Sequence, residues 1–200
     1  MGSVLVIGGG AAGLAAAIAA AECGDTVTVA EKMDRVGKKI LATGNGRCNL
    51  MNTGAPRYPG NAAFAADVLS HCGAEAQKAF WEHLGLRLRQ EEAGRVYPVS
   101  SQASSVLDAL RLQLTALHVR VVTGVSITAL HRENDGWTAL SADGQQFRAN
   151  RVIISGGGCA QPKLGSDGSA LRLLTNLGCP ATPFAPALTQ IITDSTSIKG

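Results

Sequence analysis

Residues 3–31 read SVLVIGGGAAGLAAAIAAAECGDTVTVAE, and this stretch decides the fold of the chain. It begins with the short apolar run Ser3–Ile7, passes through a glycine-rich turn into an alanine-rich segment, and ends with a second apolar run, Thr26–Glu31. A continuous apolar run bounded by glycines is typical of a parallel strand that is buried on both faces, and the alanine-rich segment predicts a helix packed closely on it. The pattern therefore predicts a strand, a turn, a helix and a second strand of an α/β fold.

The glycines of the turn follow the G-x-G-x-x-G pattern at Gly8, Gly10 and Gly13. In such turns the first glycine permits the tight bend, the second lets a pyrophosphate approach the backbone, and the third allows close packing of helix on strand. The helix N-terminus favours the phosphate charge. Glu31 ends the second strand, where a carboxylate can accept hydrogen bonds from ribose hydroxyls. A glycine-rich turn by itself can be only a turn, but all four parts together predict a dinucleotide site, for either FAD or NAD.

The composition limits the class of protein. The chain has 200 residues, of which 46% are hydrophobic and 16% charged, as expected for a compact globule. The net charge of +3 is mild and the basic residues form no stripe, which argues against nucleic-acid binding. Five cysteines without a C-x-x-C pair predict reduced, mostly buried thiols in a cytoplasmic protein. The first 21 residues lack a basic segment and are interrupted by glycines, so we expect neither a signal peptide nor a membrane span.

The segment Lys32–Asn52 follows the acidic end of the second strand and is rich in cations and glycines. Such a loop can form a second surface around a diphosphate, although a solvated basic loop would have the same composition. A P-loop is excluded, because Gly37 and Lys38 are followed by Lys39 where that motif has Ser or Thr.

Two motifs in this segment, Gly37–Leu41 (GKKIL) and Gly44–Asn49 (GNGRCN), resemble the signature of bacterial FAD-dependent flavoproteins related to aminoacetone oxidase and the BaiN-like reductases. The resemblance continues at Gly94–Pro98, Lys163–Gly168 and Pro186–Leu188. It implies an α/β, Rossmann-like FAD-binding domain with a parallel sheet, a helical excursion and a β-meander, of the two-dinucleotide-domain flavoprotein type. Asn45 stands where the family usually has glycine, which adds a side chain near the expected cofactor.

Periodicity divides the rest of the chain. Helical spacing predicts an excursion over about 61–118, in which two helices with an apolar face that includes Phe64 and Val68 break near Gly73. Alternating residues predict a surface β-meander over about 137–149. Prolines near residue 185 suggest a linker. We therefore expect an FAD-binding domain at 1–185 and the start of a second, truncated domain at 186–200.

The resemblance implies an FAD-dependent oxidoreductase that transfers a hydride through the flavin to or from a small organic substrate, by amine oxidation or enone reduction. NAD(P)H is a possible electron donor, and neither a nucleic acid nor a membrane is an expected partner. Arg47, Cys48 and Asn49 are the candidate catalytic residues beside the flavin ring, with Arg47 as a positive charge that stabilises reduced flavin. No metal-ligand spacing is present. Two alternatives stay open, an NAD-dependent dehydrogenase and a truncated half-flavoprotein that binds nucleotide without turnover.

The remaining candidates bind the cofactor. In two-dinucleotide-domain flavoproteins a residue at the position of Ile127 lays its backbone against the adenine. The run Ser155–Gly157 follows a buried strand and resembles a motif that completes the FAD site in related flavoproteins, although a plain turn is the alternative. The full set of candidate cofactor-binding residues is Gly8, Gly10, Ala11, Ala12, Gly13, Glu31, Lys32, Gly37, Lys38, Lys39, Gly44, Gly46, Arg47, Ile127, Ser155, Gly156 and Gly157.

Overall fold

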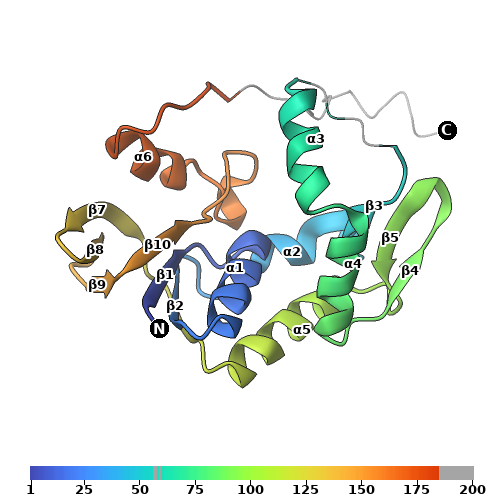
Figure 1. The fold of residues 1–200 in the computed structure, drawn as a ribbon, viewed down its shortest axis with the longest axis horizontal. Coiled ribbons are helices and arrows are strands. Elements are labelled where there is room, and N and C mark those ends of the chain that lie inside the picture. Colours follow the sequence, from blue (N-terminus) through green and yellow to red (C-terminus); the bar gives the residue numbers. More distant parts are fainter. Residues whose placement is uncertain (56–57, 59, 185–200) are drawn as a thin grey trace, which may run out of the picture.

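The computed structural model describes residues 1–55, 58 and 60–184. A four-stranded parallel sheet lies at its centre, with strand order β10-β1-β2-β6 (Figure 1). Its strands are β10 (Arg151–Ile154), β1 (Ser3–Ile7), β2 (Thr26–Glu31) and β6 (Arg120–Thr123). Ile7 pairs with Ala30 on one side and with Ile154 on the other, so three strands end at the same edge of the sheet. The predicted Rossmann-like parallel sheet is thereby confirmed.

One face of the sheet is covered by helices. Helix α1 (Ala11–Glu22) crosses from β1 to β2 and buries Leu14 and Ile18 completely against Val4 and Val6. Helix α5 (Ala103–Ala116) adds the buried residues Val106, Leu107 and Leu110 to the same cluster. Each such buried aliphatic side chain contributes roughly 1.5–3 kcal/mol relative to an exposed one. This packing holds α1, and with it the glycine turn, rigidly on the sheet.

The opposite face carries the β-meander, which starts at Ile127, ten residues before the predicted start near residue 137. It consists of β7 (Ile127–Glu133), β8 (Gly136–Ser141) and β9 (Gln146–Ala149), all antiparallel. Because successive side chains of a strand point to opposite faces, Leu5 and Ile7 pack here, with Ala139 and Phe147, whereas their neighbours face the helices. The 3₁₀ segment η3 (Pro162–Leu164) and α6 (Ser169–Asn176) follow the sheet's last strand, and α6 completes this layer (Figure 1).

The helical excursion predicted over about 61–118 is part of a longer insertion, residues 32–119, that connects β2 with β6. It contains α2 (Lys38–Ala42), the 3₁₀ segment η1 (Thr43–Gly46), β3 (Met51–Asn52), α3 (Ala62–His71), α4 (Ala74–His83), β4 (Leu88–Gln90), η2 (Glu92–Gly94), β5 (Arg95–Pro98) and α5. The break near Gly73 is confirmed. The strands of the excursion form a small antiparallel sheet of order β3-β5-β4. The expected apolar face of α3 is not packed, since Phe64 and Val68 are 65% and 46% exposed.

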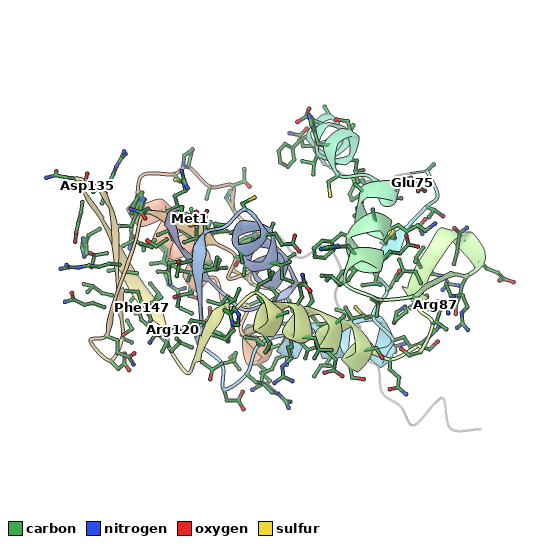
Figure 2. All side chains as sticks on the ribbon, turned by 60° about the horizontal axis from the view of Figure 1, so that its bottom comes forward. Met1, Glu75, Arg87, Arg120, Asp135 and Phe147 are labelled. Atoms are coloured by element: carbon green, nitrogen blue, oxygen red, sulfur yellow. The ribbon has the colours of Figure 1, made fainter. Side chains whose placement is uncertain are left out.

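The meander and the β4 part of the excursion lie at opposite ends of the molecule, as the positions of Asp135 and Arg87 in Figure 2 show. In the described part of the chain, no helix combines the length and the apolar character needed to cross a bilayer. The segment 186–200, expected to begin a second domain, lies outside the described residues.

Candidate cofactor-binding site

A hollow of ≈ 210 Å³ lies against the glycine turn at the carboxyl edge of the sheet. Gly10 is the N-cap of α1, and a Cβ added to it would meet no atom within 4 Å. The backbone of the turn therefore faces open space, at the end of a helix whose N–H groups and dipole favour an anion. The hollow is lined by Gly8–Ala12, Glu31, Met33, Arg35, Gly37–Lys39, Ser155–Gly157 and Leu164–Ser166.

Two of the glycines allow close backbone packing around this hollow. A Cβ on Gly13 would lie 1.9 Å from the carbonyl oxygen of Gly8, so helix and strand approach as closely as the sequence pattern predicts. Gly8 has φ +106° and faces Gly156 at the end of β10, where a Cβ would come within 2.8 Å of the Gly156 Cα. Ser155 donates its hydroxyl hydrogen toward the carbonyl oxygens of Ile7 and Gly8, at 3.1 and 2.9 Å. Ser155 and Gly156 thus fasten the end of β10 to the glycine turn.

Glu31 is held in place by the backbone. Its side chain is buried, Oε2 accepts a hydrogen bond from the Gly9 N–H at 2.6 Å, and Oε1 accepts one from the Met33 N–H at 2.8 Å. Each carboxylate oxygen has a second lone pair, so both can still accept from a ligand hydroxyl. The carboxylate is therefore preorganised at the edge of the sheet, where the sequence predicts a ribose contact.

The cations of the segment after β2 have different partners. Lys38 forms an ion pair with Asp34 at 2.5 Å, whereas Arg35 and Lys39 line the hollow without an ion pair among the described residues. Lys39 donates instead to the Ser166 hydroxyl at 2.5 Å. Two unpaired cations and a row of backbone N–H groups suit the two negative charges of a pyrophosphate. The donor set at this hollow therefore fits the diphosphate of FAD.

A smaller hollow of ≈ 40 Å³ adjoins the first one and shares Gly8, Glu31, Gly156 and Gly165 with it. The buried residue Ile127, at the start of β7, lines this second hollow. The contact of Ile127 with an adenine stays a prediction.

Lys32 also lines the smaller hollow, but its ammonium group is engaged. It lies 2.6 Å from Asp167 Oδ1 and 3.0 Å from the Ser169 hydroxyl.

The motif around Arg47 lies beyond α2 and lines neither hollow. Gly37 begins α2 in the left-handed conformation, with φ +73°, and its N–H donates to the Gly9 carbonyl oxygen at 2.8 Å, which ties the helix to the glycine turn. Five helical residues then advance the chain by roughly 7 Å. The predicted site residues at this far end of α2 are Gly44, Gly46, Arg47, Cys48 and Asn49.

Asn45 adopts φ +53°, a left-handed conformation in which Asn is the residue type that best replaces glycine. This explains how the departure from the family pattern is tolerated.

Arg47, predicted as a positive charge beside the flavin ring, is ion-paired in the structure. Its Nη2 lies 2.5 Å from Glu91 Oε1, and its guanidinium carbon lies 4.1 Å from the centre of the Tyr97 ring. Arg89 contacts the same oxygen of Glu91 at 2.9 Å. These hydrogen bonds, with that from Arg47 first, lower the pKa of Glu91. Two guanidinium groups thus share one carboxylate, and the cluster keeps one net positive charge.

The cysteines differ from the expectation of mostly buried thiols. Only Cys48 is buried, and burial raises its pKa, so the thiol stays protonated at neutral pH. The exposed cysteines are Cys23, Cys72, Cys159 and Cys179. In the described part of the chain, no group of three or more His, Cys, Asp or Glu side chains is arranged to hold a metal ion.

Six residues that line the larger hollow were missing from the sequence-based set: Gly9, Met33, Arg35, Leu164, Gly165 and Ser166. Arg35 could have been predicted from the sequence, because it is a cation in the basic segment directly after β2. Gly165 and Ser166 lie in the Lys163–Gly168 motif, but only the fold brings that motif beside the glycine turn.

Comparison with known proteins identifies the family. Residues 2–187 match the model of the HI0933-like protein Rossmann domain. The chain is 44% identical over 196 residues to the 3-dehydro-bile acid delta(4,6)-reductase of Clostridium scindens, covering 96% of this chain and 47% of that protein. It is 25% identical over 191 residues to the ribosomal RNA dihydrouridine synthase of Haemophilus influenzae, covering 90% of this chain and 46% of that protein. The chain thus spans about half the length of these curated relatives.

A flavocytochrome c3 fumarate reductase in its open conformation has a similar fold, with a TM-score of 0.63 at 17% identity, over 88% of this chain and 40% of that one. The family resemblance, the Rossmann-like fold and FAD as the cofactor are confirmed by these matches together. The chain belongs to the HI0933-like family of FAD-binding Rossmann domains.

Proposed function

We propose that this chain is the FAD-binding part of an oxidoreductase that reduces a carbon–carbon double bond conjugated to a carbonyl group in a small organic substrate. The names of two relatives support this substrate class. A 3-dehydro bile acid with a delta(4,6) system contains double bonds next to a ketone, and dihydrouridine is the product of saturating a double bond next to a ring carbonyl. When bound, FAD supplies the hydride chemistry, and the protein binds, orients and tunes it.

The single observation that carries the proposal is the open hollow at the glycine turn, which is lined by cations and backbone N–H groups that can bind a pyrophosphate. We assign the pyrophosphate to the N–H groups of the turn, supported by the cations Arg35 and Lys39, and the ribose hydroxyls to Glu31. Ile127 marks the adenine end in the smaller hollow.

The flavin ring belongs at the other end of the site. The meander that carries Ile127 lies on one side of β1, and α2 leads away on the other side (Figure 1). A dinucleotide whose adenine lies near Ile127 therefore extends along α2 toward Arg47, Cys48 and Asn49. In this arrangement the net positive charge shared by Arg47, Arg89 and Glu91 favours an anionic reduced flavin, and Asn49, which is exposed, can donate a hydrogen bond to the ring. Cys48 is buried and its thiol stays protonated.

An absorbance experiment tests the proposal. The purified chain, mixed with FAD and freed of excess, should retain the visible spectrum of bound flavin. After anaerobic reduction, a 3-oxo-4-ene steroid should restore the oxidised spectrum faster than a uridine-containing RNA does. An amine, which is an electron donor, should not bleach the oxidised flavin. A colourless protein that binds NAD would favour an NAD-dependent dehydrogenase. Bound flavin that no acceptor reoxidises would favour a half-flavoprotein without turnover, and NADH or NADPH in place of dithionite tests the electron donor.

We place the protein in the cytoplasm, because exposed free thiols suit a reducing compartment.

A further inference from the structure

Two side-chain contacts join segments far apart in the sequence on either side of the cofactor hollows. The strap, defined as residues 164–169, follows β10, and it meets the segment after β2 twice. Lys32 contacts Asp167 at 2.6 Å, and Lys39 donates to the Ser166 hydroxyl at 2.5 Å. Gly165, the neighbour of Ser166, has φ +97°, and a Cβ added there would lie 3.2 Å from Met33 Cγ. The strap therefore rests directly on the residues that follow Glu31.

The position of the strap matters because it lies where the two hollows meet. Gly165 lines both of them, together with Glu31, Gly8 and Gly156. A ligand that fills both hollows must pass the place where the strap touches Met33. The strap and the segment after β2 therefore both lie against such a ligand at this place.

The side chains of Ser166 and Asp167 are held in place by their surroundings. Ser166 is almost completely buried and packs against Gly157, where an added Cβ would lie 2.8 Å from the Ser166 hydroxyl oxygen. Asp167 Oδ1 also accepts the Ser169 N–H at 3.0 Å, which orients the carboxylate toward Lys32. The side chains of Lys32 and Asp167 are 20% and 42% exposed, so water and salt can reach the ion pair.

We propose that Asp167 and Ser166 are positioning residues that hold Lys32 and Lys39 across the junction of the hollows, and that they thereby retain the bound dinucleotide. This inference rests on the proposed FAD site. The hydrogen bond from Lys32, reinforced by Ser169, keeps the pKa of Asp167 well below its usual range, so the ion pair persists throughout the neutral and mildly acidic range.

The rate of FAD release tests the proposal. Asp167→Asn keeps an acceptor for the Ser169 N–H but removes the charge that faces Lys32. A partly exposed ion pair of this kind is worth little, so FAD should leave the variant about twofold to fivefold faster than it leaves the unmodified chain. Asp108→Asn is the matched control, because it makes the same charge change at an exposed position on α5. Release is measured as the fluorescence increase of free FAD after dilution of the loaded protein.

Two further measurements distinguish the loss of the strap's contacts from a general loss of protein stability. Raising the salt concentration should accelerate release from the unmodified chain more than from Asp167→Asn, since salt screens the pair only where it exists. Lys32→Gln should accelerate release by a similar factor, and the double variant should be no faster than either single one.

The outcomes distinguish the strap from the site itself. Equal release rates for Asp167→Asn and the unmodified chain would overturn the strap while leaving the FAD site intact, and so would an equal acceleration in Asp108→Asn. If no variant and not even the unmodified chain binds FAD, the proposed function fails, and the strap's role in retention fails with it. Amide hydrogen exchange of residues 165–167 in FAD-free protein gives an independent check, with faster exchange expected in Asp167→Asn.

Discussion

Gly10 offers the sharpest separation between the cofactor site and the fold. In Gly10→Val the new side chain would enter the open hollow, because no atom lies within 4 Å of a Cβ at this position. The backbone there has φ −82° and ψ −173°, an extended conformation that suits a β-branched residue. The substitution should therefore leave the protein folded and obstruct only the ligand.

The expected magnitudes follow from these contacts. Valine is a poorer N-cap than glycine, which costs about 1 kcal/mol of folding free energy and lowers Tm by about 2–4 °C in a chain of this size. If the isopropyl group keeps the pyrophosphate from two charge-assisted hydrogen bonds, binding loses about 3–6 kcal/mol. The Kd for FAD should then rise by about 10² to 10⁴. Gly10→Ala, with one methyl group, should show a smaller increase.

Gly13→Ala is the contrasting variant, since its Cβ would lie 1.9 Å from the Gly8 carbonyl oxygen and 2.5 Å from the Ser155 hydroxyl. Backbone must move, so the loss of stability should reach about 3 kcal/mol and lower Tm by about 6–12 °C. Thermal unfolding of the FAD-free proteins and calorimetric FAD titration measure both effects. Normal FAD stoichiometry and affinity in Gly10→Val, or a Tm loss as large as that of Gly13→Ala, would refute the assignment of the hollow.

Three other predictions concern titratable groups. Glu31→Ala should weaken FAD binding. It should also lower the stability of the FAD-free protein by about 1–3 kcal/mol for each backbone N–H that loses the carboxylate as its acceptor, namely the N–H groups of Gly9 and Met33. An unchanged Tm would contradict the burial of Glu31 and its hydrogen bonds. The lowered pKa of Asp167 stabilises the folded state fully above the ordinary value of 3.8, and this contribution disappears as the pH falls from 3.8 through the folded value. Asp167→Asn should therefore lose less stability than the unmodified chain between pH 7 and pH 3, as measured by urea unfolding at both pH values. In thiol titration of the native protein Cys48 should react slowly and the four exposed cysteines rapidly, and rapid reaction of all five would argue against its burial.

Local features of the sequence predicted the central unit well. The spacing of apolar runs, alanines and glycines in segment 3–31 predicts a strand, a tight turn and a packed helix, followed by a second strand. The structure has these elements at β1, α1 and β2. The break at Gly73 and the meander were also predictable, because each depends on residues close together in the chain. The same is true of Glu31, whose place at a strand end follows from its position in an apolar run.

Tertiary structure alone decided which distant residues surround the hollow and which charges remain free. The motif that contains Ser166 reaches Lys39 only because β10 pairs with β1, which brings its carboxyl end to the same edge of the sheet. The sequence identifies Arg47 as a positive charge, but it does not show that Glu91 forms an ion pair with it. Ion pairing and burial depend on contacts across more than a hundred residues or between separate strands, and short-range periodicity does not encode them.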